Sequence, residues 1–151
     1  MDKIFNAFLD GTISVLKTMA FVEPKAGAAY LKKDDVAHGD ISGIIGMTGA
    51  VRGSLALSFS EACILKIVSN MLGEEIAEIN DDIRDAVGKI TNMVGVARKN
   101  LEAGGLIVSA AIPTVVSGKN HSIIHVMGGP SIIIPFEIDA GPFVVDVCLG
   151  K

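Results

Sequence analysis

The sequence predicts an α+β domain in which long helices pack on one face of a mainly antiparallel sheet of about six strands. Three observations lead to this prediction. Apolar residues recur at helical spacing in residues 2–20, 60–73 and 80–105. Residues 53–59 alternate between apolar and polar side chains, as in a half-buried strand. Beyond residue 105 the chain is rich in Ile and Val, and turn residues separate its apolar segments.

The first predicted helix covers residues 2–20, where apolar side chains follow one another at intervals of three and four. Pro24 and residues 27–30 interrupt this pattern. From Gly39 onward the period changes to two. Residues 40–47 and 53–59 are therefore predicted to form a β-hairpin, with a turn between them.

Two further helices are predicted in the middle of the chain. Ser60 is suited to cap the first of them, with Glu61 in its first turn, and Gly73 ends it. Asn80 caps the second, whose first turn carries two aspartates where the helix dipole favours negative charge. Two adjacent glycines at 104–105 end this helix. Its buried stripe is expected to consist of Ile83, Ala86, Val87, Ile90, Val94, Ala97 and Leu101.

Four strands are predicted for the rest of the chain, because these segments are rich in Ile and Val. They are residues 106–116, 122–127, 131–138 and 142–149. The turns between them are expected at 118–120, 128–130 and 139–141. Residues 1–151 are expected to form one domain, because this length suffices for a core and no linker divides it.

Composition narrows the classes of partner. The net charge of −4, without any basic cluster, argues against binding to nucleic acid. No apolar run reaches the roughly 20 residues of a membrane-spanning helix, and the N-terminus lacks the pattern of a signal peptide. Cys63 and Cys148 lie far apart in apolar contexts, as is typical of buried free thiols in a reducing cytoplasm. We therefore expect a cytoplasmic domain that contacts neither nucleic acid nor membrane.

Metal and phosphate sites are not expected within this chain. His38, His121 and His125 have no spacing with each other or with the cysteines that suits a shared metal. The glycines near residue 46 lack the Gly-Lys-Ser/Thr sequence of a phosphate-binding loop.

One polar helix face is the candidate functional site. Because a helix turns about 100° per residue, Asp82, Asp85, Lys89 and Asn92 share one face, nearly opposite the apolar stripe. A carboxylate, an ammonium and an amide in such a row could serve chemistry. Spacing alone favours a simpler interpretation, in which Asp85 and Lys89 form an ordinary surface ion pair worth a few tenths of a kcal/mol.

Six segments of the sequence indicate a more specific function for this helix face. They are residues 31–36, 39–46, 53–58, 67–74, 82–93 and 128–131. On these segments, and nearly end to end, the chain resembles the CheX branch of the CheC/CheX/FliY family of bacterial chemotaxis phosphatases. The resemblance implies a CheC/CheX-like fold. It also implies removal of the phosphoryl group from the aspartate of a phosphorylated CheY-type response regulator.

The family signature is Asp or Ser, three residues, Glu, two residues, Asn. Asp85 matches its first position and Asn92 its last, whereas Lys89 stands in place of the glutamate. In the family the asparagine holds the attacking water, and the glutamate pairs with a lysine of the regulator. The regulator itself carries Mg²⁺. The resemblance therefore implies a water-positioning role for Asn92 and no cofactor in this chain.

Lys89 leaves two functions open. In the first, the chain is an active phosphatase, because its partner has diverged or because Lys89 contacts the phosphoryl group directly. Asp85 could also take over the pairing, although it is shorter and displaced by about 6 Å along the helix. In the second, the chain is a catalytically impaired adaptor, because two ammonium groups repel each other across the interface.

The first helix carries no matching motif, so one candidate site is expected. The resemblance also implies a homodimer joined through sheet edges, with which the Ile- and Val-rich last strands are consistent.

Overall fold

The computed structural model describes residues 2–31, 38–49, 52–95, 108–110, 113–122 and 131–150. Within these ranges the helices and strands come in separate runs along the chain, as the sequence predicts for an α+β domain. In chain order they are α1 (Asp2–Ala20), β1 (Lys25–Ala26), β2 (Tyr30–Leu31), β3 (His38–Gly49), β4 (Arg52–Phe59), α2 (Glu61–Leu72), α3 (Asp81–Gly95), β5 (Val108–Ala110), β6 (Thr114–Ser122), β7 (Ser131–Ile138) and β8 (Gly141–Gly150).

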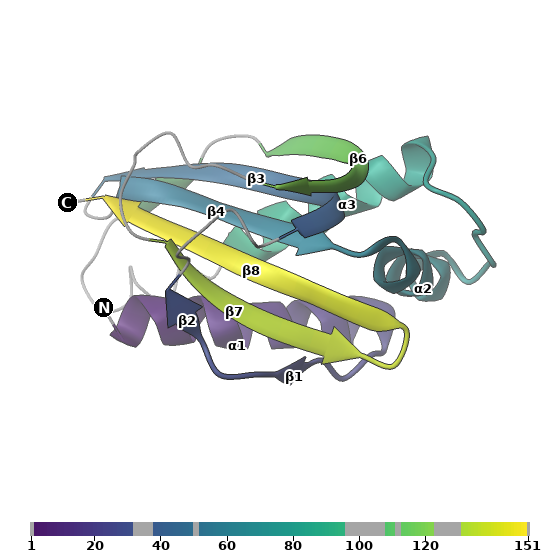
Figure 1. Ribbon diagram of the computed structural model, residues 1–151, viewed down its shortest axis with the longest axis horizontal. Helices are drawn as coiled ribbons and strands as arrows, with labels where there is room; N and C mark the ends of the chain where they lie inside the picture. Colours follow the sequence, from purple (N-terminus) through teal and green to yellow (C-terminus); the bar gives the residue numbers. More distant parts are fainter. Residues whose placement is uncertain are drawn as a thin grey trace.

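The strands form one antiparallel sheet, as predicted. Six of them lie in the order β1-β7-β8-β4-β3-β5, while β2 also pairs with β7 and β6 also pairs with β3. The hairpins β3–β4 and β7–β8 meet at the centre, where β4 pairs with β8 from Arg52↔Gly150 to Phe59↔Phe143. Helices α1 and α3 run behind this sheet (Figure 1). The sheet is therefore the platform that fixes the position of α3.

The core lies between the sheet and the helices. The inward-facing residues of the central strands are buried there, and much of the opposite face of β4 and β8 is buried as well, at Ala56, Ser58 and Asp146. Phe143 of β8 stacks on Phe59 of β4 and on Phe136 of β7, with ring centroids 5.2 and 5.0 Å apart. These two aromatic pairs join three neighbouring strands on their inner face.

Both cysteines are buried free thiols, as the sequence indicated. Burial raises the pKa of the Cys63 thiol to about 12. This thiol therefore stays protonated near neutral pH and behaves as a small apolar side chain.

Two strand predictions are wrong in detail. The predicted strand 106–116 is interrupted: β5 ends at Ala110, and β6 begins only at Thr114, after Pro113, which has no N–H to donate to a ladder. The turn predicted at 118–120 lies inside β6. There the long pairing of β6 with β3, with a shift in register between Gly39 and Ile41, outweighs the local preference for a turn.

Some elements extend or differ from the prediction at their ends. The sequence indicated no strand at β1 or β2, which are two residues long each and pair with β7. The predicted strand 122–127 contributes only Ser122 to β6, and residues 123–127 lie outside the described residues. Ala97 and Leu101, predicted for the buried stripe of α3, also lie outside them.

The caps of α2 are partly as predicted. Gly73 ends α2 with a left-handed backbone (φ +70°), and its N–H donates to Ser69 O at 3.0 Å. Ser60 occupies the N-cap position, but its hydroxyl donates instead to Pro142 O at 2.8 Å. The carboxylate of Asp40 on β3 accepts the hydrogen bond from the N–H of Glu61 at 2.8 Å. Asp40 therefore provides the capping hydrogen bond that the sequence predicted for Ser60. Because Asp40 lies on a distant strand, the local sequence could not indicate this.

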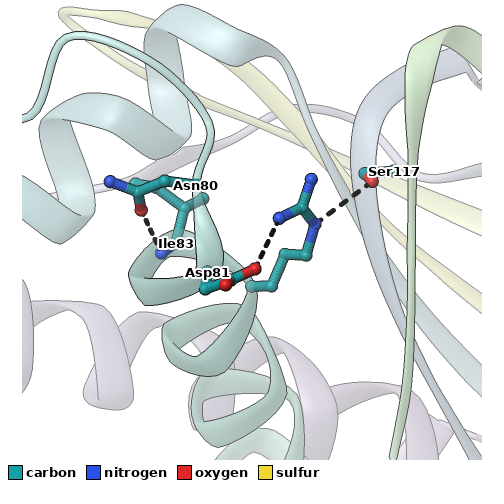
Figure 2. Close-up of polar contacts among 5 residues, drawn as sticks. Asn80, Asp81, Ile83 and Ser117 are labelled. Carbon is teal, nitrogen blue, oxygen red and sulfur yellow. Dashed lines mark hydrogen bonds and ion pairs between the residues drawn. The ribbon is translucent and has the colours of Figure 1, made fainter.

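Asn80 caps α3 as predicted. Its Oδ1 accepts a hydrogen bond from the N–H of Ile83 at 3.0 Å (Figure 2). This bond satisfies one of the N–H groups that the first turn of a helix leaves unpaired.

Asn80→Ala is expected to lower the free energy of unfolding by about 1 kcal/mol, because it removes this cap. Urea unfolding followed by circular dichroism measures the loss. Asn80→Asp is the matched control, since a carboxylate caps as well as an amide. Equal stability of the alanine variant and the wild type would contradict the cap's role.

Helix α3 approaches β3 most closely at Gly43. A Cβ added to Gly43 would overlap Thr91 Oγ1 and lie 2.9 Å from Thr91 Cβ. The Thr91 hydroxyl is turned back to its own helix, where it donates to Val87 O at 2.7 Å. The absence of a side chain at Gly43 therefore sets how deeply α3 sits on the sheet, and so which of its residues stay outside.

Candidate functional site

The outer face of α3 carries every residue of the candidate site predicted from the sequence. Asp82, Asp85, Lys89 and Asn92 are exposed on it, followed by Met93, whose side chain is 40% exposed. The opposite side of the helix is buried at the described positions of the predicted stripe, which confirms that stripe. These positions are Ile83, Ala86, Val87, Ile90 and Val94.

The outer face consists of two ridges of residues spaced four apart. One ridge is formed by Arg84, Gly88 and Asn92, and the other by Asp81, Asp85, Lys89 and Met93. The backbone rises about 1.5 Å per residue, so Lys89 lies about 4.5 Å below Asn92 along the helix axis, and Asp85 about 10 Å below it. The three predicted site residues are thus brought to one surface, on adjacent ridges.

The predicted ion pair between Asp85 and Lys89 is not formed. Among the described residues, ion pairs join Lys17 to Glu23 at 3.9 Å and Arg84 to Asp81 at 2.9 Å, but none joins these two. An exposed pair gains little in water and loses side-chain freedom, so it is easily left unmade. The ion pair that the simpler interpretation predicted is therefore wrong. The carboxylate of Asp85 and the ammonium of Lys89 both remain open to a partner.

Arg84 was missed by the sequence analysis. Its Nη1 contacts Asp81 Oδ1 at 2.9 Å, and its Nε donates a long hydrogen bond of 3.4 Å to Ser117 Oγ on β6 (Figure 2). The spacing of three between Asp81 and Arg84 could have indicated the first contact. Nothing local could indicate the second, because the predicted turn at 118–120 obscured the course of β6. The two contacts hold the guanidinium at the base of its ridge.

Gly88 is a partly exposed glycine in the interior of α3. A glycine there costs a helix about 1 kcal/mol relative to alanine. The nearest described atom to an added Cβ is Val115 Cγ2 on β6, at 3.6 Å, which is an ordinary van der Waals contact. The fold could therefore accept alanine at this position. Packing against the described residues therefore does not explain why the position between Arg84 and Asn92 on this ridge lacks a side chain.

The site is a convex helix face rather than a pocket. A surface groove of about 720 Å³ lies between the end of α1 and α2, where Phe21, Lys66 and Asn70 line it, and none of its lining residues belongs to α3. A convex face carrying an amide, a carboxylate and an ammonium suits a reacting group that a second macromolecule presents.

Two absences hold for the described part of the chain. It contains no group of three His, Cys, Asp or Glu residues placed to hold a metal ion, and His125 lies outside it. Nor does it contain a helix long and apolar enough to cross a membrane.

Residues 41–137 match the family model of the chemotaxis phosphatase CheX. The chain is 35% identical over 124 residues to the CheY-P phosphatase CheX of Thermotoga maritima, covering 80% of this chain and 79% of that protein. A crystal structure of a CheC-like superfamily protein from Shewanella sp. PV-4 superposes with a TM-score of 0.94 at 45% identity, covering 99% and 98% of the two chains.

A third similarity is to a protein complex. The CheX–CheY–BeF3–Mg²⁺ complex from Borrelia burgdorferi contains a chain that superposes on this one with a TM-score of 0.83 at 25% identity. The match covers 97% of each chain.

Proposed function

Because this chain belongs to the CheX family of chemotaxis phosphatases, we propose that it dephosphorylates the aspartyl phosphate of a CheY-type response regulator. The support is the exposed amide of Asn92 on the outer face of α3, together with the CheX relative that is named as a CheY-P phosphatase. The Borrelia complex pairs a similar chain with CheY. In this proposal the outer face of α3 docks against the regulator's phosphorylation site.

In the proposed reaction this chain contributes mainly by positioning the attacking water. Water attacks phosphorus in line with the bond to the aspartate oxygen. That bond breaks, the aspartate carboxylate is restored, and inorganic phosphate leaves with the proton of the water. An acyl phosphate already has a good leaving group, and the regulator contributes Mg²⁺ to the phosphoryl oxygens. Asn92 supplies an amide that can accept a hydrogen bond from the water and hold it in line.

Asn92 is suited to this role because it makes no hydrogen bond to another side chain or to the backbone of a different element in the described structure. Its amide is therefore free to bind water or a partner. Asp85 and Lys89, which lie on the adjacent ridge, contribute to docking. The family's homodimer remains a prediction for this chain.

Lys89 decides between the two functions. In the active enzyme its ammonium faces an acidic or neutral group of the cognate regulator, or a phosphoryl oxygen. In the alternative, the chain is an adaptor that binds the regulator without hydrolysing its phosphate. The reason for this alternative is electrostatic. If the regulator places a lysine opposite Lys89, the two ammonium groups repel each other, and the repulsion grows as the interface excludes water.

Lys89→Glu separates these functions. In the proposed enzyme, the substitution is expected to lower kcat/KM about tenfold, because it removes an attraction built for the cognate partner. Phosphate release is measured from a CheY-type regulator of the same organism, charged with acetyl phosphate. Lys66→Glu is the matched control, since it reverses the charge of an exposed lysine on α2 that lies away from the outer face of α3.

The opposite result would establish the adaptor. Wild type would then fail to accelerate phosphate release beyond the regulator's own rate, and Lys89→Glu would restore acceleration. Activity of both proteins at equal rates would exclude any contact of Lys89 with the partner.

A further inference from the structure

The ridge that holds Asn92 has an opening directly beside it. Gly88 lies one helical turn before Asn92 and one turn after Arg84, and its surface is partly exposed. Both neighbours on the ridge carry longer side chains than Gly88 does. The missing side chain therefore leaves a notch in the outer face of α3, bordered by Arg84 and Asn92, with Val115 of β6 at 3.6 Å from the position of an absent Cβ.

Arg84 borders the notch and makes two polar contacts away from Gly88. Its guanidinium lies toward Asp81 and toward Ser117 of β6, at 2.9 and 3.4 Å (Figure 2). Both contacts are exposed to solvent, so they favour this position of the Arg84 side chain without fixing it. Gly88 is partly exposed, on the same ridge as the Asn92 amide.

Packing does not explain the glycine. Among the described residues no atom lies closer than 3.6 Å to the position of a Cβ, and alanine would favour the helix. The Asn92 side chain is short, whereas Arg84 and Lys89 reach farther from the helix axis. A partner can place a phosphoryl group within hydrogen-bonding distance of this amide, or of a water bound to it, only if its own backbone comes close to α3. At Gly88 the helix itself presents no side chain to such an approach, and among the described residues Val115 borders the position.

We propose that Gly88 is a docking residue, whose missing side chain receives the backbone of the regulator loop beside the phosphorylated aspartate. The depth of this approach brings the phosphoryl group within reach of Asn92. The inference rests on the proposed function and adds a specificity determinant to it. Partners with a bulky residue at the contacting loop position are excluded by shape, whatever their charge.

The test uses two substitutions that favour the helix and fill the notch to different extents. Gly88→Ala is expected to raise the thermal midpoint by about 2–4 °C and to weaken binding of the Mg²⁺- and beryllofluoride-loaded regulator about tenfold. Gly88→Leu is expected to weaken it about a hundredfold. Isothermal titration calorimetry measures binding, and phosphate release from the acetyl-phosphate-charged regulator measures activity.

Asn6→Ala provides the matched control, because it improves helix propensity at an exposed position of α1. It is expected to stabilise the fold without changing binding. A stabilised Gly88→Ala protein that binds and dephosphorylates as well as wild type would overturn the inference and leave the proposed function intact. So would a lowered midpoint, since it would make the glycine a requirement of the fold. Failure of the wild type itself to bind and to dephosphorylate would instead overturn both.

Discussion

Asn92→Ala is expected to lower the rate of phosphate release from the regulator by a factor of about 10²–10³, which is the usual effect of removing one positioned hydrogen-bonding group from a reacting centre. The substitution leaves the buried side of α3 untouched, because Asn92 is exposed and its neighbour Thr91 makes the contact with the sheet. Folding and regulator binding are therefore expected to change little.

Single-turnover release of phosphate from a charged regulator, at saturating concentrations of the phosphatase, separates the chemical step from docking. Asn92→Gln tests whether the position of the amide matters as well as its presence. It retains the amide but displaces it by one methylene, so it should also lose most of the acceleration, since a misplacement of about 1 Å costs roughly a hundredfold. Asn6→Ala, at an exposed asparagine on α1, should retain full activity. Undiminished release by Asn92→Ala would exclude the amide from the reaction.

Gly43→Ala is expected to lower stability because it forces α3 away from the sheet. The new methyl group would overlap the hydroxyl of Thr91 and crowd its Cβ, so α3 would have to move away from β3. Overpacking of this kind costs about 1–3 kcal/mol. Because the same movement shifts the outer face, phosphate release should fall as well. Urea unfolding gives the loss of stability, and the release assay gives the loss of activity.

Gly46→Ala is the matched control for this substitution. Gly46 lies on the same strand, and an added Cβ there would meet no described atom within 4 Å. Its replacement should leave stability within about 0.5 kcal/mol of wild type. Thr91→Ala combined with Gly43→Ala should recover part of the loss, because the two residues are in contact and their effects do not add. Equal stability of both single alanine variants at Gly43 and Gly46 would refute the role given to the close approach.

The fold could be predicted largely from local patterns, since these patterns carry most of its physics. The period of the apolar residues located the three described helices and the hairpin β3–β4, while Ile and Val content and turn residues located the hairpin β7–β8. The chemistry of Asn80 and Gly73 located two of the helix ends. The errors lie where distant contacts decide. Asp40 caps α2 from another element, and β6 continues past the glycine-containing segment 118–120 through a shift in register, because β3 pairs with it on both sides of that segment.

The candidate site, like the fold, could be predicted from the sequence only in part. Helical spacing alone placed Asp85, Lys89 and Asn92 together on an exposed face, as the structure has them. It could not assign them a reaction, because an exposed amide has no chemistry without its partner; that came from the resemblance. The sequence could not indicate the contact between Arg84 and Ser117 or the space at Gly88. Both depend on how β6 lies beside α3.

The close contact between Gly43 and Thr91 has a consequence for evolution. The inner side of α3 is constrained by the sheet, while the ridge of Asp85, Lys89 and Met93 on its outer side is exposed to solvent. The two sides can therefore change independently over time. A lineage could exchange one regulator for another by replacing outward residues such as Lys89, with no compensating change in the core. Transplanting the outer residues of a relative onto this helix should then transfer that relative's choice of partner.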